Sequence, residues 1–138
     1  FISKDQDGTI IKLSDFQGKK LIVFFYPRAN TPGCTAEACN LRDNYNSLKA
    51  AGYELLGVSE DSARKQTNFK NKYELPFPLL SDEDHTVINA FGVWGPKKFM
   101  GREFEGILRT TFLIDEDGVV ERVIDKVKTK DHAAQILD

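Results

Sequence analysis

The two cysteines of the chain lie close together, in the stretch FFYPRANTPGCTAEACNLRD that spans residues 24–43. Thr31 is a residue type that caps helices and Pro32 suits the first helical position, so Cys34 is expected in the first turn of a helix. Free backbone N–H groups and the positive end of the helix dipole favour a thiolate there. The position of Cys34 therefore favours a reactive thiol.

Ionisation decides how reactive such a thiol is. A thiol with a pKa of ~8.5 is only about 3% ionised at pH 7, and a pKa lower by about two to three units makes the thiolate dominant. Such a shift corresponds to roughly 3–4 kcal/mol of preference for the charged form. Cys39 lies about 140° around the helix from Cys34, so the two thiols point in different directions. The predicted buried face of this helix carries Cys34, Ala38, Leu41, Tyr45 and Leu48.

The spacing of the two cysteines leaves four interpretations open. The first treats them as unrelated small apolar residues. A zinc site would need further ligands, and the two histidines, His85 and His132, are far from the cysteines in the sequence. A dithiol oxidoreductase uses the spacing C-x-x-C, whereas this chain has C-x-x-x-x-C. The fourth interpretation is a reactive thiol with a second, resolving thiol close by.

The elements that must position these residues alternate along the chain. Two buried strands joined through a helix predict a right-handed parallel βαβ unit, and Glu116-Asp117-Gly118 predicts an antiparallel hairpin. We therefore expect an α/β protein with a thioredoxin-like fold, in which helices flank both faces of a central mixed β-sheet. Strands are predicted at 21–26, 53–59, 77–82, 110–115 and 119–124, a short strand and turn at 7–16, and helices at 33–50, 62–74, 84–91 and 129–138.

Length and composition limit the classes of protein that fit. A chain of 138 residues is predicted to form a single domain over 1–138, and 41% apolar with 29% charged residues is typical of globular proteins. A net charge of −2 argues against a nucleic-acid or membrane-surface partner. No apolar run approaches the ~18 residues of a membrane span. Two cysteines are too few for a secreted disulfide framework, so we expect a cytoplasmic location.

A known family carries the motif around Cys34. Pro27-x-x-x-Thr31-x-x-Cys34 matches the P-x-x-x-T-x-x-C motif of the peroxiredoxins, and residues 24–43 closely resemble the peroxiredoxin Q, or bacterioferritin comigratory protein, subfamily. The resemblance continues through LLGVSEDS, FPLLSD, FGVWGPKKFMG and RTTFLIDEDGVV, and so covers nearly the whole chain. The usual opening of the family lies before the residue that corresponds to Phe1, which predicts a trimmed N-terminus.

This resemblance implies a thioredoxin-dependent peroxidase of the atypical 2-Cys kind, acting on hydrogen peroxide and organic hydroperoxides. Cys34 corresponds to the peroxidatic cysteine, and Cys39 to the cysteine that resolves its sulfenic acid as an intramolecular disulfide. Thr31 corresponds to the threonine that hydrogen-bonds near the thiolate and the peroxide. Pro27 corresponds to the proline that shields the pocket from water, and Arg109 to the active-site arginine. The resemblance also implies a monomer that needs no metal or organic cofactor.

Without the resemblance, most of these residues have simpler explanations. Arg109 would be a solvated charge, Thr31 a helix cap and Pro27 a strand terminator. A second function also stays open, namely a redox-sensing module whose cysteines signal peroxide to a partner without efficient turnover. General dithiol exchange on proteins is disfavoured by the cysteine spacing.

Several other polar and aromatic residues receive ordinary assignments. Trp94 fits a packing role as well as it fits the wall of an active-site cleft. His132 is predicted to lie on the surface of the last helix. Glu37 places a favourable negative charge in an early helical turn, and no catalytic role is assigned to it. Solvated side chains are predicted for Lys97, Lys98, Lys126, Lys128 and Lys130.

Overall fold

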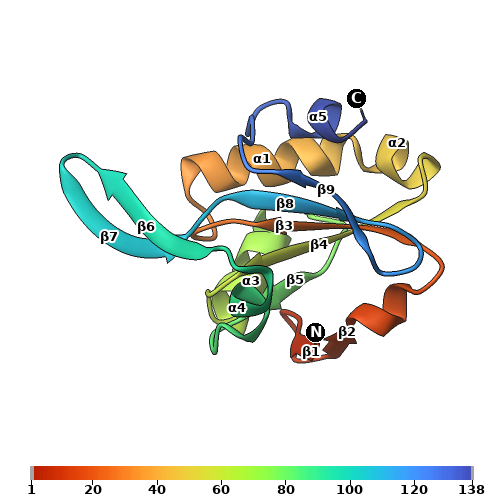
Figure 1. Ribbon diagram of the computed structural model, residues 1–138, viewed down its shortest axis with the longest axis horizontal. Coiled ribbons are helices and arrows are strands. Elements are labelled where there is room, and N and C mark those ends of the chain that lie inside the picture. The colour runs from red at the N-terminus through yellow and green to blue at the C-terminus, as the bar shows by residue number, and fades with distance from the viewer. Residues whose placement is uncertain (1, 138) are drawn as a thin grey trace.

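The computed structural model describes residues 2–137, except for the side chain of Phe99. A five-stranded sheet lies at its centre, in the order β5-β4-β3-β8-β9 (Figure 1). β3 runs parallel to β4 and β4 parallel to β5, whereas β8 is antiparallel to both β3 and β9. The predicted mixed sheet is thus confirmed. Its strands are β3 (Lys20–Phe25), β4 (Tyr53–Ser59), β5 (Leu79–Ser81), β8 (Thr110–Ile114) and β9 (Val120–Ile124).

Helices cover both faces of this sheet, as the sequence predicts. Ile22 and Phe24 of β3 join a cluster on the side of α1 (Pro32–Asp43), α2 (Tyr45–Ala50) and α5 (His132–Leu137), and Phe69 of α3 (Ala63–Lys72) belongs to the same cluster. Leu21, Val23 and Phe25 face the other side, with α4 (Thr86–Phe91). β3 is therefore buried on both faces, which explains its uninterrupted apolar sequence. Figure 1 shows α1, α2 and α5 together above the sheet.

The N-terminal segment lies on the same side as α4. It consists of β1 (Ile2–Lys4), β2 (Ile10–Lys12) and a 3-10 turn, η1 (Leu13–Phe16). Ile11, Leu13 and Phe16 pack against the cluster that contains α4. The strand and turn predicted for residues 7–16 correspond to β2 and η1, while β1 was not predicted. The expectation about the chain before Phe1 lies outside the described residues, and the single domain over 1–138 stays a prediction.

The helix predicted from Gly33 to Ala50 is interrupted at Asn44. The backbone of Asn44 has φ −107° and ψ 14°, and its side-chain amide donates to the carbonyl oxygen of Asn40 at 2.9 Å. Asparagine competes with helical hydrogen bonding in this way, so α1 ends and the shorter α2 begins. The predicted apolar face continues across the break. Cys34, Ala38, Leu41 and Leu48 are buried, and Tyr45 is half-buried and packs against the same cluster.

A second hairpin was missed by the sequence interpretation. β6 (Trp94–Phe99) pairs with β7 (Arg102–Ile107), and the hairpin extends away from the body of the molecule (Figure 1). Its turn residues, Met100 and Gly101, have φ values of +51° and +79°. Two-residue hairpin turns need positive φ, which Asn-Gly signals far better than Met-Gly does. Pro96 within β6 also argues against a strand, so the pattern is weak.

The remaining predicted elements are close to the observed ones. The helices at 62–74 and 84–91 correspond to α3 and α4, and the hairpin of β8 and β9 turns at Asp115–Gly118, where the Asp115 carboxylate accepts from two backbone N–H groups. The last helix starts three residues later than predicted, at His132. Among the described residues, none of the helices is both long and apolar enough to cross a membrane.

Candidate active site

Cys34 lies at the junction of the central sheet and the longest helix. β3 ends at Phe25, a loop follows, and α1 begins at Pro32 with Thr31 as its N-cap residue, as predicted. Cys34 is the third residue of the helix and only 2% exposed. The N-terminal turn of a helix presents unpaired N–H groups, so Cys34 lies where negative charge is stabilised.

Thr31 and Pro27 precede Cys34 in the chain. Among the described residues, neither makes a hydrogen bond to Cys34. Thr31 Oγ1 donates to the carbonyl oxygen of Arg28 at 2.9 Å, and its side chain makes no capping hydrogen bond. Thr31 therefore occupies the predicted N-cap position, but its side chain does not make the capping hydrogen bond. A hydroxyl that donates to a carbonyl keeps its lone pairs free to accept from a ligand. Pro27 is half-buried at the end of β3.

Arg109 makes the closest polar contact to the thiol. Its Nη2 lies 3.2 Å from Cys34 Sγ and its Nη1 donates to Glu37 Oε1 at 2.7 Å. Arg109 directly precedes β8, and Thr110 pairs with Phe25 at the end of β3. The sheet register thus brings Arg109 to the start of α1. The side chain is 23% exposed, so the interpretation of Arg109 as a solvated charge is wrong.

Electrostatics around Arg109 are dominated by burial and by two acidic groups. Burial of the guanidinium lowers its pKa, but the neighbouring Cys34 and Glu37 raise that pKa by more, and the net direction is upward. A guanidinium close to a thiol stabilises the thiolate and any negative charge that develops beside it. The arrangement can therefore hold a charged nucleophile next to an electrophilic oxygen.

Gly33 makes room for this guanidinium. A Cβ atom placed on Gly33 would lie 3.2 Å from Arg109 Nη2, closer than an ordinary van der Waals contact. Gly33 has no positive φ, so the close approach, and not backbone conformation, is what favours glycine here. Sequence reasoning missed this residue, because a glycine after a proline at a helix start looks like part of a turn.

Glu37 is a second residue that the sequence interpretation left out of the site. It lies one helical turn after Cys34, is fully buried, and contacts Arg109. Burial raises the pKa of Glu37 to about 7, although the charge and hydrogen bond of Arg109 lower it. The place of Glu37 beside Cys34 could have been suspected from its spacing, since residues three apart share a helix face.

The predicted surface position of His132 is wrong. The side chain is fully buried, and its Nε2 lies 2.7 Å from Thr111 Oγ1 and 3.6 Å from Glu37 Oε2. Burial lowers the pKa of His132, and the charges of Arg109 and Arg122 act in the same direction. The helical pattern at residues 129–138 was too short to show which side of α5 faces the sheet.

Cys39 is half-buried on the same helix as Cys34, and neither cysteine is in a disulfide. Burial raises the pKa of the Cys39 thiol, while Arg42 lowers it and Asp43 raises it. In a continuous helix, Cα atoms five residues apart are roughly 8.5–9 Å from one another, whereas disulfides seldom exceed about 7 Å. The structure therefore corresponds to a reduced form in which the two thiols cannot bond.

A buried polar network supports the loop between β3 and α1. Asp61 Oδ2 accepts from Ala29 N and from Ser59 Oγ, both at 2.7 Å. Gln66 Nε2 donates to Ser59 Oγ, and Gln66 Oε1 accepts from the hydroxyl of Tyr26. Because β3 and β4 are parallel, their carboxyl ends lie at the same edge, which places these polar groups beneath the loop. Parallel pairing was the signal that could have identified them.

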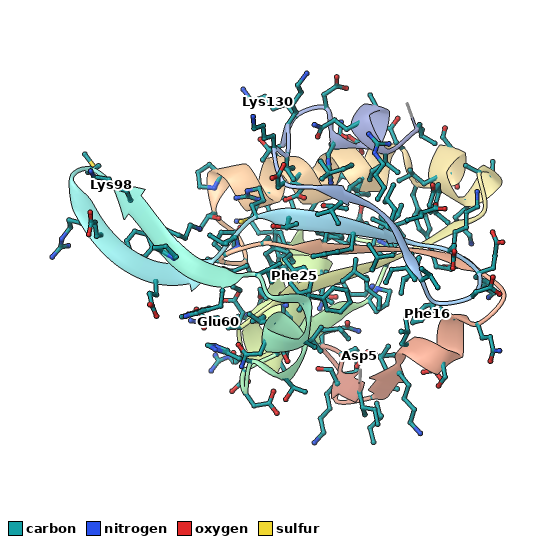
Figure 2. All side chains as sticks on the ribbon, in the orientation of Figure 1. Asp5, Phe16, Phe25, Glu60, Lys98 and Lys130 are labelled. Atoms are coloured by element: carbon teal, nitrogen blue, oxygen red, sulfur yellow. The ribbon has the colours of Figure 1, made fainter. Side chains whose placement is uncertain are left out.

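The predicted role of the lysines holds for most of them. Lys98, Lys126, Lys128 and Lys130 are exposed, and Figure 2 shows Lys98 on the projecting hairpin and Lys130 at the edge near α5. Lys97 differs, because it is half-buried and its Nζ donates to the carbonyl oxygen of Ile107 at 2.8 Å. Burial and the charge of Arg109 lower the pKa of Lys97, while Cys34 raises it.

Trp94 packs against the apolar cluster on the α4 side, and its ring lies 4.6 Å from that of His85. Its indole nitrogen also donates to Glu105 Oε2 at 3.3 Å. A packing role for Trp94 is therefore confirmed. Within residues 2–137, no three His, Cys, Asp or Glu side chains are grouped so that they could hold a metal ion.

Comparison with known proteins agrees with this geometry. The model of the AhpC/TSA family matches residues 1–123. Peroxiredoxin Bcp of Escherichia coli strain K12 is 52% identical over 138 residues, which are 100% of this chain and 88% of that protein.

Two solved structures show the same fold. The Xanthomonas campestris bacterioferritin comigratory protein, described in work on its alkyl peroxide reduction activity, has a TM-score of 0.92 and 36% identity, over 99% of this chain and 87% of that one. The peroxidoxin BcpB of Mycobacterium tuberculosis has a TM-score of 0.86 and 38% identity, over 99% and 88%.

A thioredoxin-like sheet with a buried, arginine-bound cysteine at a helix start defines a thiol-dependent peroxidase. The chain belongs to the AhpC/TSA family and, within it, to the peroxiredoxins of the Bcp or peroxiredoxin Q group.

Proposed function

We propose that Cys34 is the peroxidatic cysteine and that Cys39 resolves it. The observation that carries this proposal is the contact of Arg109 Nη2 with Cys34 Sγ at 3.2 Å, in the first turn of α1. Cys39 lies beyond the first turn of α1, and burial raises the pKa of its thiol by more than the charge of Arg42 lowers it. Of the two cysteines, Cys34 is thus the one whose surroundings favour a thiolate.

The proposed reaction begins with attack of the Cys34 thiolate on one oxygen of a hydroperoxide. The S–O bond forms as the O–O bond breaks, and the leaving oxygen takes a proton and departs as water or an alcohol. Cys34 becomes a sulfenic acid. Arg109 stabilises the negative charge on the sulfur and on the leaving oxygen, and Thr31 Oγ1 accepts a hydrogen bond from the peroxide. Pro27 limits access of water.

The second step joins the two cysteines. Cys39 attacks the sulfur of Cys34, the S–S bond forms and water leaves, so that two electrons have passed from the thiols to the peroxide. A dithiol protein of the thioredoxin type then reduces the disulfide. We further propose that the protein acts as a monomer in the cytoplasm, on hydrogen peroxide and on organic hydroperoxides. The alkyl peroxide reduction attributed to the Xanthomonas campestris relative supports the second substrate class.

Two cysteine variants test these roles. Cys34→Ser is expected to abolish peroxide consumption in an assay with thioredoxin, thioredoxin reductase and NADPH. Cys39→Ser is expected to consume about one equivalent of peroxide and then to accumulate sulfenic acid, detectable by mass spectrometry after trapping. Single-turnover consumption that survives in Cys34→Ser would overturn the assignment. If wild type turns over with a different dithiol but not with thioredoxin, only the proposed reductant is wrong and the roles of the two cysteines stand.

A further inference from the structure

Behind the thiol, a buried polar cluster connects α1 to α5. Glu37 and His132 are both fully buried, and Glu37 Oε2 lies 3.6 Å from His132 Nε2. Glu37 Oε1 already accepts from Arg109, whereas Glu37 Oε2 has no hydrogen-bond partner among the described residues. A buried carboxylate oxygen without a hydrogen-bond partner costs free energy, so we expect a proton or a donor group within the cluster to compensate for it.

The hydrogen bonds of His132 determine where its proton lies. Gln135 Nε2 donates to the carbonyl oxygen of Lys126, and Gln135 Oε1 accepts from the backbone N–H of Lys128, which fixes the orientation of this amide. His132 Nδ1 lies 2.8 Å from the same Oε1 and must therefore carry a hydrogen. In the neutral ring, His132 Nε2 is then an acceptor, which lies 2.7 Å from Thr111 Oγ1 and 3.6 Å from Glu37 Oε2.

Two lone pairs that face one another inside a protein repel, and one proton between them removes the repulsion. The proton can lie on Glu37 Oε2 and point at His132 Nε2, or it can lie on the imidazole. Thr111 Oγ1, at 2.7 Å from Nε2, can donate or accept as required. The rise of the Glu37 pKa to about 7 by burial agrees with a proton that stays at neutral pH.

The proton on the Glu37–His132 pair affects the ionisation of Cys34 through the charge of Arg109. Arg109 is the cation that contacts both Cys34 and Glu37. If Cys34 is a thiolate and the Glu37–His132 pair holds one proton, the three-part cluster is neutral. If the pair loses that proton, Glu37 and Cys34 are two buried anions that share one guanidinium. Like charges that share a site disfavour one another's ionisation.

We propose that Glu37 and His132 share one buried proton and thereby reserve the positive charge of Arg109 for the Cys34 thiolate. His132 is in this sense a positioning residue, which acts on Cys34 through Glu37 and Arg109. α5 then belongs to the peroxidase site although it contacts no reacting atom. The positive charge of Arg122 in β9 also lowers the pKa of His132 and so favours a neutral ring. The proposal rests on the proposed role of Cys34.

Two isosteric variants separate this proposal from a merely structural role. Glu37→Gln imitates the protonated carboxyl, because its oxygen can accept from Arg109 while its amide donates to His132 Nε2. His132→Gln places an amide donor beside Glu37 and so stabilises the carboxylate. The rate of single-turnover peroxide reduction is measured against pH in both variants and in wild type. His85→Gln is the matched control, since His85 pairs with Glu60 and is partly exposed.

We expect His132→Gln to move the acid midpoint of the rate profile upward by about one pH unit, which is about tenfold less thiolate on the acid side. Glu37→Gln is expected to keep the acid midpoint of wild type and to lack the second titration that the shared proton produces near neutral pH. His85→Gln should match wild type at every pH. An unchanged midpoint in a folded His132→Gln variant would overturn the proposal, as would a Glu37→Gln profile that retains both titrations.

A measurement that does not use the reaction keeps the two proposals distinguishable. Nitrogen chemical shifts of His132 in the reduced wild-type protein are expected to show hydrogen on Nδ1, and to change on the Nε2 side as the pair titrates. If peroxide reduction by wild type fails while these shifts are as expected, the role of Cys34 is wrong and the proton-sharing pair stands. If the shifts show hydrogen on Nε2 alone, the pair is wrong whatever the activity.

Discussion

Arg109 approaches Cys34 beside Gly33, which has no side chain to obstruct the guanidinium. A Cβ atom on Gly33 would lie 3.2 Å from Arg109 Nη2. The residue type at position 33 therefore controls how closely the guanidinium can approach the thiol. Glycine is a poor helix former, and its presence in the first turn of α1 costs stability that alanine would restore. Rate and stability therefore make opposite demands on this residue.

The substitution Gly33→Ala is expected to slow peroxide reduction while leaving the protein as stable as wild type, or more stable. The new methyl group displaces the guanidinium by a few tenths of an ångström, which we expect to reduce the second-order rate constant roughly threefold to tenfold. Alanine adds up to about 1 kcal/mol to the free energy of unfolding. Stopped-flow kinetics and urea denaturation measure the two quantities.

Arg109→Met provides the reference for this experiment, because it removes the charge altogether. Loss of one charge-assisted contact of ~1.5–3 kcal/mol corresponds to at least about a tenfold loss of rate. Gly33→Ala should lie between wild type and Arg109→Met. A rate constant equal to that of wild type would mean that the close approach at Gly33 has no influence on the thiol.

At the scale of elements, α1 must satisfy two incompatible requirements. As a helix it holds Cys34 in its first turn beside Arg109, but the same helix keeps Cys34 and Cys39 too far apart to bond. Asn40 ties the middle of α1 to α5, since its Oδ1 accepts from Ala133 N at 2.8 Å and its Nδ2 donates to the carbonyl oxygen of Lys130 at 3.1 Å. The turns before Asn40 are held through the side chain of Glu37, which accepts from Arg109 and lies beside His132, but among the described residues they make no such hydrogen bond to the backbone at α5.

We therefore predict that disulfide formation unwinds α1 from Pro32 to about Cys39 and leaves the helix after Asn40 in place. The loop to be closed is very short, so the encounter is fast once these turns open. Amide hydrogen exchange of the reduced and oxidised forms measures this. Protection should be lost on oxidation at residues 35–43, whose N–H groups bond to carbonyl oxygens of residues 31–39, and kept from Asn44, whose N–H bonds to the carbonyl oxygen of Asn40.

Cys39→Ser after one equivalent of peroxide serves as the control for this prediction, because it carries an oxidised Cys34 without a disulfide. Its exchange pattern should remain that of the reduced protein. An oxidised wild-type protein with a confirmed Cys34–Cys39 bond and undiminished protection at residues 35–43 would contradict the unwinding.

For the whole molecule, the buried carboxyl of Glu37 links folding to pH. Its pKa rises from an ordinary value of 4.5 to about 7 on burial. Between these values the folded protein holds a proton that the unfolded chain has lost, so the free energy of unfolding falls as pH increases. His132 acts in the opposite sense, because its lowered pKa means that the unfolded chain takes up a proton first as pH falls.

Comparison of wild type with Glu37→Gln isolates the contribution of the carboxyl, since His132 is present in both proteins. We predict that wild type loses stability relative to Glu37→Gln as pH rises from about 4.5 to about 7, by up to about 3 kcal/mol. Urea denaturation across this pH range measures the difference. A constant difference at all pH values would show that Glu37 ionises in the folded protein as it does in the unfolded chain.

Much of the fold could be predicted from the sequence because its signals are local. The uninterrupted apolar run of β3, the Pro32 start of α1 and the turn at Asp117–Gly118 each depend on residues close in the chain. The hairpin of β6 and β7 escaped prediction because its turn, Met100–Gly101, adopts positive φ without the usual residue types. The break at Asn44 depends on a side-chain hydrogen bond that competes with the helix.

The sequence by itself determined the position of Cys34 at a helix start and its distance along the chain from Cys39, since a helix needs only neighbouring residues to form. Arg109 was assigned through a family resemblance, and nothing in its local sequence distinguishes it from a surface charge. Its contacts with Cys34 and Glu37 join residues 75 and 72 positions apart. They exist only because β8 pairs with β3 in one register.

Tertiary structure alone decided the environment of Glu37, Gly33 and His132. The sequence of the last helix is too short to show which of its sides is buried. In the structure, α5 packs against α1 and places His132 beside Glu37. Burial then raises the pKa of the carboxyl and lowers the pKa of the imidazole, because a low-dielectric interior disfavours isolated charge. Such effects arise from what surrounds a residue in space, which its neighbours in the chain do not reveal.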